Sequence, residues 1–162
     1  YGGLGELAVG IGFGLLIVVG TYYVQLGKLP LKVFLISLPL SILVALILFI
    51  NEFPDYEADK AVGKKTLVVI LGKKKAILLY HILLAIMYLI IIFLVLFEFL
   101  PFFCLIALFS LPLALSSFDV SRKNFQKVQE LLPANVLTIR LHSLVGILLC
   151  AGLALDKAFL VK

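Results

Sequence analysis

Tryptophan is absent from this sequence of 162 residues, methionine occurs once, and charged side chains make up only 14%. In soluble domains about a quarter of the residues are charged and about half are apolar. This chain is 64% hydrophobic, with a mean hydropathy of +1.23. The composition therefore excludes an ordinary soluble domain, and it also excludes a disordered chain, which would be short of apolar residues. One core of this size could not bury so much apolar surface, so we expect most of the chain to lie in lipid.

Cysteine is nearly as scarce. Cys104 and Cys150 lie inside apolar runs, without CxxC spacing or a histidine at metal-ligand distance, so we expect packed thiols and neither a disulfide nor a metal site. A positively charged segment ahead of the first apolar run is also lacking, which argues against a signal peptide. Because the chain begins with Tyr1, we expect it to be a piece of a longer protein.

Five apolar runs approach the roughly 20 residues that a helix needs to cross a bilayer. They are continuous and do not alternate as the strands of a membrane barrel do, so they must be helices. The sequence predicts an all-α fold, a polytopic transmembrane helix bundle that forms a single membrane domain over residues 1–162. The predicted helices cover residues 7–25, 31–50, 76–97, 102–118 and 136–155, with long loops at 51–75 and 119–135.

Positive charge is unevenly distributed between the two sides of this bundle. The two long loops carry nine lysines and arginines, and the opposite side carries four. By the positive-inside rule this places both loops in the cytoplasm of a multi-pass membrane protein. Glycines in the first helix predict close approach of another helix; they are Gly10, Gly12, Gly14 and Gly20.

Polar residues gather directly after the second predicted helix, over residues 51–67. Asp55 and Asp59 are four apart, so on a helical turn their Cβ atoms lie roughly 6 Å apart on one face. Magnesium favours one or two such carboxylates and completes its shell with water and phosphate oxygens. Lys64 and Lys65 follow the flexible Gly63 and can supply point charges to the same phosphates. The alternative is a solvated loop whose acids and lysines pair with each other or with lipid head groups.

Two other motifs do not fit this segment. An EF-hand loop beginning at Asp55 requires glycine where Lys60 stands and glutamate where Thr66 stands. A Walker loop requires glycine at the position of Ala58 and serine or threonine at that of Lys65.

The run from Asn51 to Leu67, with its DxxxD and the following Gly-Lys-Lys-Thr-Leu, resembles the second aspartate-rich motif of the UbiA superfamily of intramembrane prenyltransferases. The opening Gly-Leu-Gly-Glu and the segment 20–25 resemble its menaquinone branch, which prenylates 1,4-dihydroxy-2-naphthoate. The resemblance implies a nine-helix bundle around a lipid-open cavity, of which these would be the last five helices. The family's first motif, N-D-x-x-D-x-x-x-D, has no match in these 162 residues.

By the same resemblance Asp55 and Asp59 are ligands of Mg²⁺, and Lys64, Lys65 and Asn51 contact the diphosphate. Glu6 and Arg140 are candidates for the acceptor pocket, because ionisable groups within membranes usually face a cavity or a partner. Arg140 lies near a predicted helix start, so it could equally extend to the membrane interface.

The implied function is Mg²⁺-dependent transfer of a polyprenyl group from polyprenyl diphosphate to an aromatic quinone precursor in menaquinone biosynthesis. Such a pathway suits the cell membrane of a prokaryote, its inner membrane. With one DxxxD only, the isolated piece is expected to be inactive without the N-terminal helices that carry the first motif. Alternatives are another acceptor, such as 4-hydroxybenzoate, a haem precursor or an archaeal glyceryl lipid, or a non-catalytic membrane subunit or transporter fragment. A transporter would carry its ionisable residues at mid-membrane, whereas here they collect at the membrane edge. No nucleic-acid partner is expected.

Overall fold

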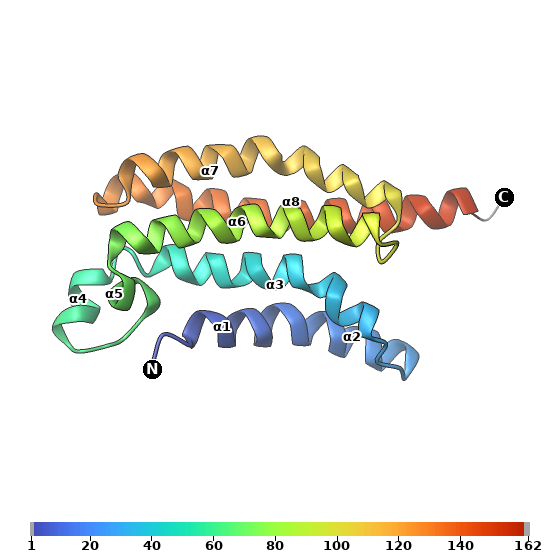
Figure 1. Cartoon of the computed structure of the whole chain (residues 1–162), viewed down its shortest axis with the longest axis horizontal. Coiled ribbons are helices and arrows are strands. Elements are labelled where there is room, and N and C mark those ends of the chain that lie inside the picture. The colour runs from blue at the N-terminus through green and yellow to red at the C-terminus, as the bar shows by residue number, and fades with distance from the viewer. Residues whose placement is uncertain (1, 161–162) are drawn as a thin grey trace.

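The structure is a computed structural model that describes residues 2–160, with side chains described for residues 2–158, and the regular elements in that part are all helices (Figure 1). Five helical spans are long and apolar enough to cross a membrane, as the all-α transmembrane class predicts, and the class is confirmed. The protein is an integral membrane protein. The spans are Gly5–Leu26, Leu31–Asn51, Lys73–Leu96, Phe102–Asn124 and Val128–Ala158.

The first and fourth spans each contain a segment of different helical pitch. The elements in chain order are α1 (Gly5–Val9), the π-helix η1 (Gly10–Leu15), α2 (Leu16–Leu26), α3 (Leu31–Asn51), α4 (Tyr56–Ala61), α5 (Leu67–Leu71), α6 (Lys73–Leu96), the 3₁₀-helix η2 (Phe102–Ser110), α7 (Leu111–Asn124) and α8 (Val128–Leu160).

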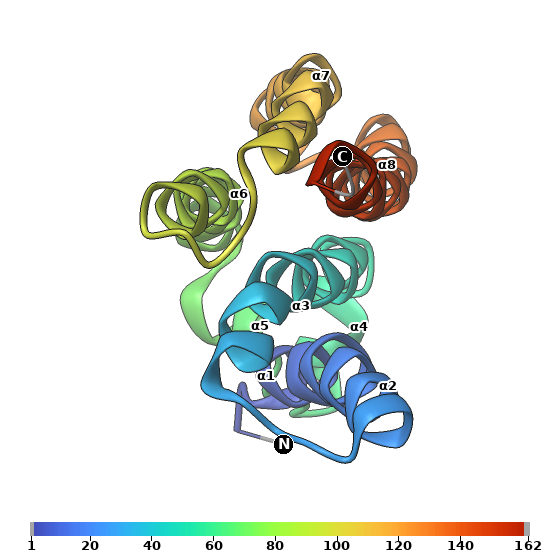
Figure 2. The ribbon, with the colours of Figure 1, turned by 90° about the vertical axis from the view of Figure 1, so that its right-hand side faces the viewer.

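Helix α3 lies at the centre of the bundle. In the end view it separates α1 and α2 from the group formed by α6, α7 and α8 (Figure 2). Its side chains Leu43, Leu46 and Phe49 are completely or almost completely buried in the core. The short helices α4 and α5 lie at the same end of the bundle as the start of α1 and the connection between α7 and α8 (Figure 1). The polar segment therefore forms one end of an apolar bundle.

Hydrogen bonds between hydroxyl groups join the later helices inside the bundle. The Tyr80 hydroxyl of α6 lies 2.7 Å from both Ser117 Oγ of α7 and Thr138 Oγ1 of α8. A second pair, Tyr88 and Ser110, is 2.6 Å apart. Such side chains stabilise helix contacts in lipid, where apolar surface alone gives no preference for another helix over the acyl chains.

The long loops predicted from the charge pattern are mostly helical. Between α7 and α8 only residues 125–127 lie outside a helix, so the predicted loop 119–135 is wrong. Residues 51–75 contain α4, α5 and the first residues of α6. Charged side chains mark where the chain leaves the lipid, but a helix satisfies its own backbone hydrogen bonds and can continue into water.

Two of the four glycines in the first span lie against α3, as predicted. A Cβ atom at Gly14 would lie 2.3 Å from Ser41 Cα, and one at Gly10 would lie 2.9 Å from the Ser41 carbonyl oxygen. At Gly12 and Gly20 nothing lies within 4 Å of that position, so the expected contact is not formed there. Close approach of the first span to α3 therefore depends on positions 10 and 14.

A Gly14→Ala substitution is expected to destabilise the bundle by ~1–3 kcal/mol, because its methyl group would overlap backbone atoms of Ser41 that cannot move independently. The thermal unfolding midpoint in detergent measures this effect. Gly12→Ala is the matched control on the same π-helix and should leave the midpoint unchanged or raise it. Equal midpoints for the two variants would contradict the close packing of η1 on α3.

Candidate functional site

The two aspartates of the DxxxD motif lie on one helical turn. Asp55 precedes α4 at its N-terminal cap position, and the Asp59 backbone N–H donates a 2.8 Å hydrogen bond to the Asp55 carbonyl oxygen. Asp59 is buried, with 8% of its surface exposed, whereas Asp55 is exposed. One carboxylate is thus held within the protein and the other faces outward from the end of the bundle.

A tight turn after α4 brings Lys64 back to Asp59. Gly63 has a φ of 73°, a left-handed conformation that glycine adopts without strain, and the Lys64 N–H then donates to the Asp59 carbonyl oxygen at 2.9 Å. Lys64 Nζ lies 3.0 and 3.1 Å from the two carboxylate oxygens of Asp59. The hydrogen bond with Asp59 is the main cause that raises the pKa of Lys64 above its ordinary value.

Lys65 and Lys64 also line an open surface depression of about 540 Å³, together with Gly63 and Val62. Both side chains are exposed. An anion that entered this depression would meet two cationic groups from consecutive residues, at a distance of one short turn from the DxxxD carboxylates. The two lysines therefore lie beside the DxxxD turn, and their contact with a diphosphate stays a prediction.

Helix α1 contributes a buried carboxyl group to the same end of the bundle. Glu6 is 4% exposed, and its Oε1 accepts a 2.9 Å hydrogen bond from the backbone N–H of Leu67 at the start of α5. Nearby, the Gly3 N–H donates to the Lys65 carbonyl oxygen at 2.9 Å. These two bonds fix the segment that contains both lysines to the start of the first span.

Glu52, the first residue after α3, forms a buried carboxyl pair with Glu6. Glu52 is 8% exposed, and the Oε2 atoms of both glutamates are buried without a donor. Burial raises the pKa of Glu52 to about 9, and hydrogen bonding and charge repulsion from Glu6 act in the same direction. Glu52 is therefore protonated at neutral pH, and its proton allows the two carboxyl groups to share a hydrogen bond.

Stability is expected to fall as the pH rises towards 9. A carboxyl group whose pKa is raised by folding stabilises the folded state fully below its ordinary pKa of 4.5, and that stabilisation is lost as the pH rises through about 9. The thermal midpoint in detergent should therefore be lower at pH 9 than at pH 6. Glu52→Gln should flatten this dependence, because an amide stays neutral and can still donate to Glu6.

The matched control for this titration is Glu57→Gln, which removes an exposed carboxylate of α4. It should keep the full pH dependence. The groups that act on Glu52 are Glu6, Lys64 and Asp59, so the slope is assigned to Glu52 only if the Glu52→Gln variant alone removes it.

The Asn51 side chain has a partner within the bundle: Asn135 of α8 donates a hydrogen bond from Nδ2 to Asn51 Oδ1. The Oδ1 atom of Asn135 is buried without a donor. Asn135 was not among the predicted site residues, and neither was Glu52. A single asparagine among the apolar residues of the last span was the available signal for Asn135.

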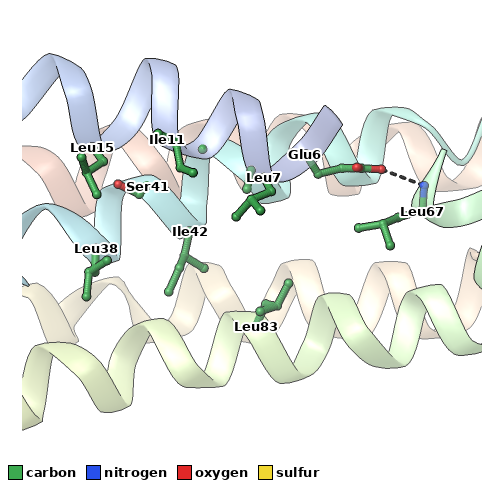
Figure 3. A pocket seen from close by; sticks show the side chains of 11 residues that line it. Glu6, Leu7, Ile11, Leu15, Leu38, Ser41, Ile42, Leu67 and Leu83 are labelled. Carbon is green, nitrogen blue, oxygen red and sulfur yellow. Dashed lines mark hydrogen bonds between the residues drawn. The ribbon is translucent and has the colours of Figure 1, made fainter. Parts of the chain in front are cut away.

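An apolar cavity of about 300 Å³ lies between the first span and α3, next to this polar end. Figure 3 shows Glu6 and Leu67 at one end of it, with Ile11, Leu38 and Ile42 among the side chains farther in. The Glu6 carboxyl group is directed towards the Leu67 amide, away from these aliphatic side chains (Figure 3). The cavity therefore offers an aliphatic lining that starts directly behind the loop with the lysines.

Arg140 lines a different cavity, on the surface of α8 beside Pro133 and Val136. The structure thus does not bring Glu6 and Arg140 together in one pocket, although both were candidates for the acceptor. Arg140 is exposed, and because α8 begins at Val128 it lies twelve residues into the helix and not near its start, as the sequence had suggested.

Residues 1–144 match the model of the UbiA prenyltransferase family. The chain belongs to the UbiA prenyltransferase family. It is 33% identical over 160 residues to UbiA prenyltransferase domain-containing protein 1 of Rattus norvegicus, which covers 98% of this chain and 45% of that protein. It is 39% identical over 79 residues to 1,4-dihydroxy-2-naphthoate octaprenyltransferase of Bacillus subtilis, which covers 49% of this chain and 25% of that protein.

The corresponding octaprenyltransferase of Haemophilus influenzae is 40% identical over 86 residues, covering 53% of this chain and 28% of that protein. This UbiA chain spans less than half the length of each of these relatives. No solved structure gives a significant match.

The acidic side chains of this UbiA chain can supply part of a metal site. Among residues 2–158 no group of three or more His, Cys, Asp or Glu side chains is placed to hold a metal ion. Magnesium, however, needs only one or two carboxylates when water and phosphate oxygens complete its shell. Asp55 and Asp59 are hard oxygen donors on one turn, and a cation bound there would share the Asp59 carboxylate with Lys64, which lies within hydrogen-bond distance of both of its oxygens.

Proposed function

We propose that this chain forms part of a membrane enzyme that transfers a polyprenyl group from polyprenyl diphosphate to an aromatic quinone precursor, 1,4-dihydroxy-2-naphthoate. The observation that carries the proposal is the arrangement at one end of the bundle. There the DxxxD carboxylates and two lysines lie next to an apolar cavity that begins at Glu6 and Leu67. Carboxylates that hold a metal ion, together with lysines, can bind a diphosphate, and an apolar cavity can hold a hydrocarbon chain.

The acceptor is suggested by the relatives rather than by the cavity. The Bacillus subtilis and Haemophilus influenzae relatives are named for octaprenyl transfer to 1,4-dihydroxy-2-naphthoate, although each aligns with only about half of this chain. We further propose that a second aspartate-rich loop, outside these 162 residues, completes the metal site. The greater length of the relatives supports this, since the chain spans at most 45% of those described above.

Transfer begins when the allylic carbon–oxygen bond breaks and its electron pair leaves with the diphosphate. Magnesium bound by Asp55 and Asp59 would neutralise part of that negative charge. Lys64 and Lys65 would present ammonium groups to the same oxygens; the turn at Gly63 sets the backbone position of both residues, and Asp59 holds the Lys64 side chain. Positioned charges of this kind stabilise the departing group more than flexible ones would.

The carbocation left on the prenyl chain must react with the aromatic ring and not with water. The aliphatic side chains around Ile11, Leu38 and Ile42 exclude water from the proposed path of the chain. When the acceptor is the naphthoate, a ring carbon forms a bond to the carbocation; the bond between the ring and the carboxylate then breaks, carbon dioxide leaves, and the electron pair of that bond restores the aromatic ring. We propose that the end of the bundle that carries α4, α5 and the connection between α7 and α8 faces the cytoplasm of an inner-membrane enzyme, because most lysines and arginines are at this end.

The test uses membranes that contain the protein with both aspartate-rich loops. Labelled polyprenyl diphosphate and one acceptor at a time are added to these membranes, and the prenylated product is measured. Product is expected with 1,4-dihydroxy-2-naphthoate. Product from 4-hydroxybenzoate or a glyceryl phosphate alone would overturn the proposed acceptor while keeping prenyl transfer. No product with any acceptor would overturn the enzymatic function and favour a non-catalytic membrane subunit.

A further inference from the structure

A second groove lies between α6 and α7, on the side of the bundle away from α1 and α2 (Figure 2). Its volume is about 190 Å³, and it is partly open to the outside of the bundle. Leu84 and Tyr88 of α6 and Leu115 and Phe118 of α7 are among its lining residues. Both helices are membrane spans, so this α6–α7 groove opens towards lipid.

The α6–α7 groove is lined by His81 and otherwise by apolar and aromatic side chains, and beyond its His81 end lie the exposed cations Lys74 and Arg122 and one exposed acid, Asp119. His81 Nε2 lies 2.9 Å from Ser121 Oγ, and the His81 ring centroid lies 4.2 Å from that of Phe118. Arg122 directly follows Ser121, is exposed, and is close enough to act electrostatically on His81. Lys74 is also exposed and precedes His81 by seven residues, which is two turns along the same face of α6.

The start of α6, which carries Lys74, and the end of α7, which carries Arg122, lie at the same end of the bundle as α4 and α5 (Figure 1). Because charged side chains gather at this end, we place the edge of the bilayer there. Basic side chains between membrane helices at this level attract anionic lipid head groups, each contributing measurably to binding. The aliphatic part of the groove continues from them into the bilayer. A ligand that matches both parts has a phosphate at one end and a hydrocarbon chain at the other.

We propose that the α6–α7 groove binds one anionic phospholipid, with its head group between Lys74 and Arg122 and an acyl chain along Leu84, Tyr88 and Leu115. The groove lies apart from the DxxxD site and does not depend on the proposed enzymatic function. A zwitterionic lipid fits the aliphatic part equally well but gains less at the cationic end, so the groove should select lipids by net head-group charge.

The absence of tryptophan from the chain allows a direct test, because an introduced tryptophan is its only one. Leu115→Trp places this fluorophore in the groove at a position that is 60% exposed and tolerates a larger side chain. The full chain is reconstituted in mixed bilayers in which either phosphatidylglycerol or phosphatidylcholine carries bromine on its acyl chains. Brominated phosphatidylglycerol is expected to quench the fluorescence of the introduced tryptophan more strongly than brominated phosphatidylcholine does. The quenching should correspond to a local share of phosphatidylglycerol about fivefold above its share of the whole bilayer.

The matched control is Ile82→Trp, on the exposed surface of α6 and outside the groove, with the fluorophore at a similar distance from the polar end of its helix. It should show no preference between the two lipids. A double variant, Lys74→Gln with Arg122→Gln, should abolish the preference that the fluorophore reports from position 115, whereas Lys123→Gln should leave it unchanged.

Equal quenching by the two lipids at position 115 would overturn the proposal. A preference for phosphatidylglycerol at position 82 as large as that at position 115 would also overturn it, because it would show general enrichment of this lipid around the protein. A preference that survives the double variant would overturn the role of Lys74 and Arg122. Each variant is first checked for its helix content and thermal midpoint. Leu111→Trp, at another position in the groove, serves as a second reporter.

Discussion

Prenyl transfer is expected to fall by ~100-fold or more when Asp59 is replaced by asparagine in the protein that carries both aspartate-rich loops. Asp59 is the buried member of the DxxxD pair, and its carboxylate is held by Lys64 at 3.0 and 3.1 Å. Asparagine keeps the size of the side chain but removes the charge that would bind a divalent cation. It also removes the charge that holds Lys64 in place, so both proposed charge-stabilising groups are affected by one substitution.

The measurement is turnover of labelled polyprenyl diphosphate at increasing Mg²⁺ concentration, together with the thermal midpoint. Glu57→Gln removes an exposed carboxylate from the same short helix and should leave turnover within about twofold of the unmodified protein. Wild-type turnover in the Asp59→Asn variant would exclude this motif from the metal site. Activity that persists in the unmodified protein after chelation of all divalent ions would exclude metal assistance altogether.

How much of this site the sequence could predict depends on the separation of its members along the chain. Only ten residues contain Asp55, Asp59 and Lys64. Helical spacing and the glycine at position 63 were therefore enough to predict that the three side chains lie close together. The structure places the two aspartates on one turn and pairs Asp59 with Lys64. Local geometry of this kind follows from backbone preferences, which a sequence states directly.

Contacts between distant segments could not be predicted in the same way. Glu6 meets Leu67 across 61 positions, and Asn51 meets Asn135 across 84. Both contacts depend on which helices become neighbours, and an apolar run carries little information about its neighbour in lipid because most of its faces are apolar. The same limitation explains why Arg140 was grouped with Glu6, although the two line separate cavities.

The ends of the helices show a further limit. Apolar content locates the crossing of the bilayer, and all five crossings were found. It does not locate the end of a helix, so α7 and α8 extend well into the region predicted as a loop. One consequence is that Ser121 and Arg122 stand on a helix at the edge of the membrane, where regular spacing aligns them with the α6–α7 groove.

A Glu6→Ala substitution is expected to raise the KM for polyprenyl diphosphate by ~10–100-fold, with a smaller effect on kcat. Glu6 holds the Leu67 amide at 2.9 Å and thereby fixes the segment that presents Lys64 and Lys65. Alanine leaves that amide without its acceptor and leaves Glu52 without its carboxyl partner, so the segment can move away from the end of the first span. Glu6→Gln keeps an acceptor oxygen and should restore most of the affinity.

The two substrates distinguish positioning from direct contact. If Glu6 acts through the lysine segment, the KM for the diphosphate changes and the KM for the aromatic acceptor stays nearly constant. A change confined to the acceptor would instead return Glu6 to the acceptor pocket that the sequence suggested. A third outcome is a lower thermal midpoint with unchanged KM values for both substrates. It would show that the hydrogen bond from Leu67 stabilises the bundle without placing the lysines, because a purely structural contact alters unfolding but not the binding of a charged ligand.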